Sequence, residues 1–230
     1  MNHAPVRRTL KRALPPPGPR RMPLGVSRGI TMHVDFASQT RAFLGLYELE
    51  LGRHLRRLCP LGSRAFDVGG QFGYDALVLA KLGGAAVASF EADAGCVATM
   101  RENFALNPLL GPLITPVTAW VGNGDDGTLA LDDFARSPQG FVPDVIKIDV
   151  DTEHSADMAE GRVLEGASEL LAQRRPSLLV EVHSLELEQR CGALLVAHGY
   201  RPTIVSQRRV LRDHRPIAHN RWLVAEGRAR

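Results

Sequence analysis

The sequence has few cysteines, few aromatic residues and no long apolar segment. Its three cysteines, Cys59, Cys96 and Cys191, are odd in number and lack CxxC spacing, which argues against a disulfide scaffold or a zinc knuckle. Aromatic residues make up 6% of the 230 positions. No stretch approaches the roughly 20 apolar residues that a membrane span needs. These features predict a cytoplasmic protein without a transmembrane span.

The N-terminal segment lacks the pattern of a secretory signal, because its first 25 residues contain no apolar run of seven or more. The triple proline Pro15 to Pro17 disfavours a helix there. We expect residues 1–24 to form a flexible, basic, Pro-rich arm. A chain of 230 residues with 44% hydrophobic content suffices for one sizeable core, so residues 25–230 are expected to form a single domain.

Acidic residues are scarce at both ends of the chain. Of the 28 Lys and Arg, seven precede Ile30 and eight follow His198, whereas 23 of the 25 acids lie between these two positions. A basic tail can attract nucleic acid or an anionic membrane. A solvated arm is the more common interpretation, and we expect no nucleic-acid partner.

Short apolar runs rich in β-branched residues alternate with longer segments of helical period, which is typical of a parallel sheet with helices on both faces. The pattern predicts an α/β fold with a doubly wound, mostly parallel, seven-stranded, Rossmann-like sheet and an antiparallel C-terminal strand. Pro116 places the third strand near an edge. The expected strands are Arg64–Val68, Ala86–Phe90, Leu113–Val121, Asp144–Val150, Ser177–Val182, Tyr200–Ser206 and His219–Glu226.

Helices are expected between these strands, at Tyr74–Gly83 and Ala94–Leu106. A further helix is expected to present one apolar face between Val163 and Leu171. The apolar positions between Leu187 and His198 indicate an amphipathic helix, which is expected to end at Gly199.

The loop after the first expected strand reads Gly69-Gly70-Gln71-Phe72-Gly73. Such a loop lets the backbone approach a ligand closely, and the next helix offers free N–H groups to an anion. We therefore expect a Gly69→Val variant to fold but to lose its ligand. Glu91 ends the second strand, where an acid commonly accepts hydrogen bonds from ribose hydroxyls.

The spacing of the glycines narrows the choice of cofactor. The dinucleotide fingerprint requires glycine at loop positions one, three and six, but positions three and six are Gln71 and Tyr74. A Walker phosphate loop is also absent from the sequence, because no Gly-Lys-Ser or Gly-Lys-Thr follows. The remaining pattern, acid-x-Gly-x-x-x-Gly from Asp67, resembles class I S-adenosylmethionine methyltransferases. Ordinary turn glycines and a solvated acid are the alternative interpretation.

Several further stretches, in order, resemble the FkbM family of methyltransferases, named for an O-methyltransferase of macrolide biosynthesis and thus of secondary metabolism. The sequence departs from that family in its Gly-Gly-Gln loop and in an insertion from Asp151 to Arg162. The stretches are "TRAFLGLYELELGRHLRRL", "FDVGGQFGYDALVLAKLGG", "FEAD" with "ENFALN", "LDDF", "VIKIDV", "VLEGASELL" and "LLVEVH".

The resemblance implies S-adenosylmethionine as the cofactor. It assigns Glu91 to the ribose, and the segment of Ala119, Trp120 and Val121 to the adenine. A core or lid role for Trp120 remains open. The residues implied to cradle the methionine part are Asp67, Gly69, Gly70 and Gly73.

Two candidates for catalysis lie at strand ends, Asp149 and His183. Histidine has a pKa suited to taking a proton near neutral pH, so His183 is the predicted base, with Asp149 orienting it or contacting a ligand. A helix cap or a structural rim histidine is the alternative for His183. Glu153, His154 and Asp157 in the insertion match no metal-site spacing, and no metal is expected.

The predicted function is therefore O-methylation of a small-molecule, sugar or natural-product hydroxyl. The sequence leaves open an amine acceptor and a homo-oligomer. A non-catalytic, cofactor-binding or scaffold member of a biosynthetic complex is the alternative. A nucleic-acid methyltransferase is less favoured, because the "NPLL" stretch at Asn107 follows a predicted helix rather than the fourth strand.

Overall fold

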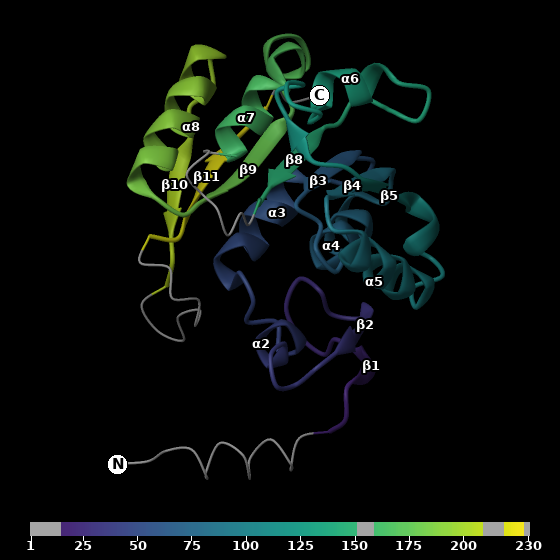
Figure 1. Cartoon of the computed structure of the whole chain (residues 1–230). Coiled ribbons are helices and arrows are strands. Elements are labelled where there is room, and N and C mark those ends of the chain that lie inside the picture. Colours follow the sequence, from purple (N-terminus) through teal and green to yellow (C-terminus); the bar gives the residue numbers. More distant parts are fainter. Residues whose placement is uncertain (1–14, 151–158, 209–218, 228–230) are drawn as a thin grey trace.

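A seven-stranded sheet runs through the centre of the computed structural model, which describes residues 15–150, 159–208 and 219–227 (Figure 1). Neighbouring strands are parallel except at the C-terminal strand β11, which is antiparallel to both of its neighbours. The sheet predicted from the sequence is thus confirmed. Its strands, in order across the sheet, are β10 (Thr203–Ser206), β11 (Arg221–Ala225), β9 (Ser177–Val182), β8 (Val145–Ile148), β3 (Ala65–Val68), β4 (Val87–Glu91) and β5 (Ile114–Thr118).

The order of the strands reverses at β3, which lies between β4 and β8. Ligands of open α/β sheets bind beyond the carboxyl ends of the strands at such a point. The outer strand β5 pairs with β4, and Pro116 stands opposite Ser89 in that pair. An edge strand tolerates a residue without an N–H, and the expected edge position is confirmed.

Helices cover both faces of the sheet, and each face has its own apolar core (Figure 1). On one face lie α3 (Gly52–Leu58), α4 (Tyr74–Gly83) and α5 (Ala94–Ala105). On the other lie α6 (Leu131–Arg136), α7 (Ala159–Glu165) and α8 (Leu185–Ala197). The sheet is therefore doubly wound, and its central strands are buried on both faces.

The helix ends follow the sequence signals. The Asp93 carboxylate accepts a hydrogen bond from the Cys96 N–H at the start of α5, and the Ser184 hydroxyl accepts one from the Leu187 N–H at the start of α8. Gly84 and Gly199, which follow α4 and α8, have φ values of 63° and 78°. These left-handed positions favour glycine.

The helix expected around Val163 and Leu171 is divided in two. It consists of α7 and a π-helical segment, η4 (Leu170–Arg174). Between them, a Cβ on Gly166 would lie 1.9 Å from the Gly122 carbonyl oxygen, so the backbones meet too closely for any other residue. The Asp132 carboxylate accepts hydrogen bonds from the N–H groups of Glu169 and Leu170, at 2.8 and 2.9 Å. These bonds replace the helical ones lost at the break.

An N-terminal hairpin, β1 (Gly18–Arg21) and β2 (Thr31–Val34), packs against α5. The Asn107 side chain accepts from the Thr31 N–H and donates to the Thr31 carbonyl, at 2.9 and 2.7 Å. Met22 is only 2% exposed. The arm boundary expected at residue 24 is therefore wrong, because it falls within a folded hairpin. Residues 1–14 lie outside the described residues.

Five shorter elements complete the described part of the fold. They are α2 (Thr40–Phe43), η1 (Leu49–Leu51), η2 (Gly111–Leu113), β6 (Val121–Gly122) and β7 (Leu129–Ala130).

None of the helices in the described ranges is long and apolar enough to cross a membrane.

Candidate active site

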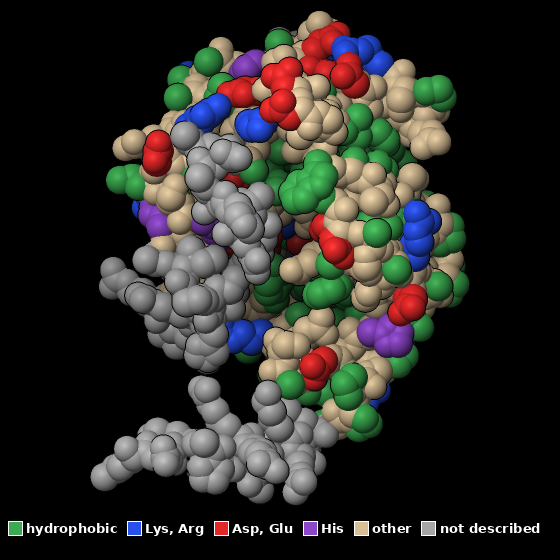
Figure 2. Space-filling model, in the orientation of Figure 1, with side chains coloured by type: hydrophobic (Ala, Val, Ile, Leu, Met, Phe, Trp, Pro, Cys, Tyr) green, Lys and Arg blue, Asp and Glu red, His purple; other side chains and the backbone are tan. Residues whose placement is uncertain are grey.

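A cavity of about 770 Å³ lies beyond the carboxyl ends of β3, β4, β5 and β8. The face of the molecule in Figure 2 is hollowed near its centre. The strand ends supply one wall, and the N-terminal hairpin with the segment after it supplies another, including Met22, Met32 and Tyr47. The cavity thus lies at the topological switch point.

The glycine loop borders this cavity through Gly69, Gly70 and Gln71, whereas Gly73 does not line it. A Cβ on Gly69, whose φ is 85°, would lie 1.7 Å from the Asp149 carbonyl oxygen. A Cβ on Gly70 would lie 2.2 Å from the Ser89 hydroxyl oxygen. The space that these glycines leave is therefore filled by protein atoms. The structure thus predicts that Gly69→Val destabilises the fold, contrary to the expectation from the sequence.

Glu91, the last residue of β4, also lines the cavity. One carboxylate oxygen accepts from the Gln71 N–H and the other from the Asp93 N–H, both at 2.9 Å. These hydrogen bonds fix the glycine loop to the end of β4. A carboxylate oxygen can accept two hydrogen bonds, so this arrangement leaves acceptor capacity at each oxygen.

Asp67 lies beneath the loop and does not line the cavity. It is fully buried, and the Ser89 hydroxyl donates to its Oδ2 at 2.7 Å. Burial raises the pKa of Asp67 to about 7, an effect that the Lys147 ammonium partly offsets. In this structure Asp67 thus supports the loop from below.

Ala119 and Trp120 line the cavity beyond β5. The Ala119 N–H donates to the Glu91 carbonyl at 3.0 Å, which ties this segment to β4. The Trp120 side chain is 63% exposed, so Trp120 is not part of the core.

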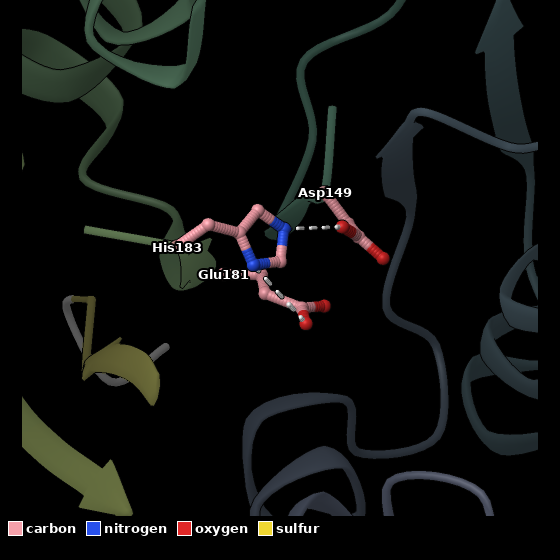
Figure 3. Close-up of side chains that lie close together, drawn as sticks. All are labelled: Asp149, Glu181 and His183. Atoms are coloured by element: carbon pink, nitrogen blue, oxygen red, sulfur yellow. Dashed lines mark ion pairs between the residues drawn. The ribbon is translucent and has the colours of Figure 1, made fainter. Parts of the chain in front are cut away.

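The two predicted catalytic residues lie together (Figure 3). Asp149 follows β8 directly, and His183 follows the neighbouring strand β9. The His183 Nε2 is 3.8 Å from Asp149 Oδ1, and its Nδ1 is 4.0 Å from Glu181 Oε1. Asp149 lines the cavity, but His183 does not. Asp149 is therefore the member of the pair that faces the cavity.

A buried charge cluster beside this pair was missed from the sequence. The Lys147 ammonium, fully buried, is 2.9 Å from Asp75 Oδ2 and 3.4 Å from Asp149 Oδ2. Burial alone would lower the pKa of Lys147, but the surrounding carboxylates outweigh it and hold that pKa well above its usual value. Burial also raises the pKa of Glu48 to about 7, against the opposing effect of Lys147. The sequence did contain a signal for this cluster, namely a lysine in an otherwise apolar strand, two residues before Asp149.

Most of the insertion, residues 151–158, lies outside the described residues, and with it Glu153, His154 and Asp157. Its last residues, up to Arg162, belong to α7.

Comparisons with known proteins place the fold. No family model and no curated protein sequence matches the chain. Solved structures do. An S-adenosylmethionine-dependent O-methyltransferase from Thermotoga maritima has a TM-score of 0.53 and 16% identity, with 77% of this chain and 64% of that one covered.

Aeropyrum pernix fibrillarin, solved with natively bound S-adenosyl-L-methionine, has a TM-score of 0.53 at 15% identity over 73% of this chain and 68% of its own. A precorrin-6y C5,15-methyltransferase from Geobacter metallireducens has 0.51 at 13% identity, over 79% and 88%. The chain has the class I S-adenosylmethionine-dependent methyltransferase fold. The cavity lies beyond the carboxyl ends of the strands, where open α/β sheets bind their ligands.

Proposed function

We propose that the protein is an S-adenosylmethionine-dependent O-methyltransferase of the FkbM type, which methylates a hydroxyl group of a small molecule, a sugar or a natural product. The observation that carries the proposal is a single cavity lined by the glycine loop, by Glu91 and by Asp149. One space thus holds an acid suited to a ribose and a carboxylate suited to a reacting hydroxyl.

The cofactor would bind along the strand ends. Its ribose hydroxyls would donate to Glu91, whose oxygens each retain acceptor capacity. Its adenine would lie against Ala119 and Trp120, and its methionine part along Gly69 and Gly70. Asp67 and Gly73 would act indirectly, by shaping the loop from behind.

Transfer would occur by in-line displacement. Bound S-adenosylmethionine would supply an activated methyl group: the acceptor oxygen would form a bond to the methyl carbon while the bond from that carbon to sulfur breaks, and the electron pair of that bond would return to sulfur to leave S-adenosylhomocysteine. The hydroxyl proton would pass to Asp149 rather than to His183, the base expected from the sequence, because Asp149 lines the cavity and His183 does not. His183 would be a positioning residue behind Asp149. Holding the reactants in line supplies much of the rate, and a positioned base adds to it.

The size and lining of the cavity suit two ligands. Its volume of about 770 Å³ lies in the upper part of the range for ligand pockets, roughly 300 to 1,000 Å³. The wall opposite the strand ends combines the apolar side chains of Met22 and Met32 with polar ones, Gln39 and Arg41 among them. An acceptor with both apolar and polar groups would lie against this wall.

A labelled-methyl experiment tests the proposal. The full chain is incubated with S-adenosylmethionine carrying an isotopic methyl group and with extracts of the producing cell, and mass spectrometry then finds the labelled product. Asp149→Asn should lower product formation by about 10² to 10⁴. The matched control is Asp133→Asn, an exposed acid on α6 whose side chain is 64% exposed.

Two results would refute the proposal. If the protein binds the cofactor but labels nothing in any extract, it is a non-catalytic binding member of the fold. If the labelled product carries its methyl group on nitrogen, the assignment of a hydroxyl acceptor is wrong.

A further inference from the structure

Three side chains with metal-binding atoms converge at the ends of β8 and β9 (Figure 3). Ile148 pairs with Val180 in the register of these parallel strands, so Asp149 and Glu181 come next to each other at the following position. His183 projects from the same face as Glu181, because side chains alternate along a strand. One ligand atom from each of the three residues lies within 4.8 Å of the other two.

The donor set is two carboxylate oxygens and one imidazole nitrogen. Calcium and magnesium prefer sites made of oxygen alone, whereas imidazole suits divalent first-row transition metals. The chemistry of the three side chains thus favours a divalent first-row transition metal over calcium or magnesium.

Buried carboxyl groups outnumber buried cationic side chains around the three residues. Lys147 is the only Lys or Arg that is buried in the described part of the chain, whereas Glu48 and Asp67 are buried acids near it and Glu181 is a buried acid near Asp149. Asp149 turns Oδ2 toward Lys147 and Oδ1 toward His183. The carboxylate can therefore keep its contact with the ammonium while its other oxygen serves an ion.

The cavity supplies an entry path. Asp149 lines it, so an ion held at Oδ1 would be reached from the cavity rather than through the core. Catalytic metal sites combine about three protein ligands with an open position for water or substrate. We propose that Asp149, Glu181 and His183 form a site for a divalent first-row transition-metal ion, with its open position facing the cavity.

Binding of the ion requires the three donor atoms to move closer together. In an octahedral site with bonds of about 2.1 Å, neighbouring ligand atoms lie about 3 Å apart and opposite ones about 4.2 Å apart. The 3.8 Å contact to Asp149 belongs to Nε2 of His183 and the 4.0 Å contact to Glu181 belongs to Nδ1. A single nitrogen would bind the ion, and one ligand atom from each residue lies within 4.8 Å of the other two. The proposed role, polarising the acceptor hydroxyl so that it loses its proton more readily, rests on the proposed function, and with the ion bound it would replace direct proton transfer to Asp149, whose oxygens would then contact the ion and Lys147. Binding of the ion does not rest on the proposed function.

Manganese binding by the untagged full chain tests the site. Mn²⁺ is titrated into metal-free protein, and electron paramagnetic resonance measures the free ion, while pulsed measurements detect coupling to a ligand nitrogen. We expect one strong site per chain with histidine nitrogen coupling. His183→Gln and Glu181→Gln should each weaken binding about tenfold or more, whereas His198→Gln, a histidine at the end of α8, should bind Mn²⁺ as the unmodified protein does.

The absence of nitrogen coupling in the unmodified protein would overturn the proposal, whatever the variants do. So would unchanged affinity in a folded His183→Gln protein, which would place the ion elsewhere. Calorimetry with S-adenosylmethionine is run on the same samples. If the protein binds S-adenosylmethionine but not Mn²⁺, the metal site alone is rejected. If it binds Mn²⁺ but not S-adenosylmethionine, the proposed function alone is rejected.

Discussion

At the scale of single residues, the site requires a residue without a side chain at position 69. Gly69 has no side chain because the Asp149 carbonyl occupies the place of a Cβ, 1.7 Å away. This contact joins the glycine loop of β3 to the end of β8, where the predicted chemistry lies. The glycine loop was predictable from the sequence, but its packing against the Asp149 backbone was not, since the neighbour of Gly69 across the sheet depends on tertiary structure.

The Gly69→Ala variant should therefore be strongly destabilised, by more than about 1 kcal/mol. Its φ of 85° disfavours alanine, and its Cβ would overlap backbone. Gly192→Ala is the control, because it lies within α8 and a Cβ there meets nothing within 4 Å. It should stabilise the protein by roughly 0.5 to 1 kcal/mol. Equal urea midpoints for the two variants would contradict this explanation.

Asp67 should make stability depend on pH. Its pKa is about 7 in the folded protein and about 3.8 when unfolded. Between these values the folded chain holds a proton that the unfolded chain has released, so stability falls as pH rises through this window. Urea unfolding from pH 4.5 to 8 should show a smaller fall for Asp67→Asn. An identical fall in both proteins would show that Asp67 does not hold this proton.

At the scale of elements, the strands and helices of the sheet followed from the sequence because their signals are local. Periodicity, the capping residues Asp93 and Ser184, and the glycines after α4 and α8 each act within a few residues. Strand ends then brought Asp149 and His183 together as predicted. Lys147 and Glu48 were missed because they meet across the fold, and the hairpin because its two strands have only four residues each.

Removing the first strand of the hairpin should destabilise the domain. Met22 is buried, and β1 pairs along its whole length with β2, which Asn103 and Asn107 hold to α5. Deletion of residues 1–22 should therefore lower the melting temperature relative to deletion of residues 1–14, since the shorter deletion leaves β1 intact. Equal melting temperatures for the two truncated proteins would show that β1 adds no stability.

At the scale of the whole molecule, the sheet and the hairpin enclose one cavity between them. The sheet supplies Glu91, the glycine loop and Asp149, and the hairpin side supplies a second wall of mixed apolar and polar side chains. The fold was predictable from strand order and loop spacing. The acceptor was not, because the shape of the second wall depends on how the hairpin packs. The central claim is that this cavity binds S-adenosylmethionine through Glu91.

Isothermal titration calorimetry with S-adenosylmethionine tests that claim most directly, on the unmodified protein, on Glu91→Ala and on Glu102→Ala. Glu102 is an exposed acid on α5 and serves as the control. Circular dichroism first establishes that each variant is folded, since Glu91 also anchors the Gln71 and Asp93 N–H groups.

The unmodified protein and Glu102→Ala should bind alike. Glu91→Ala should bind roughly 10- to 150-fold more weakly, the equivalent of about 1.5 to 3 kcal/mol for lost charge-assisted hydrogen bonds. A folded Glu91→Ala protein with unchanged affinity, or no binding by the unmodified chain, would contradict the account.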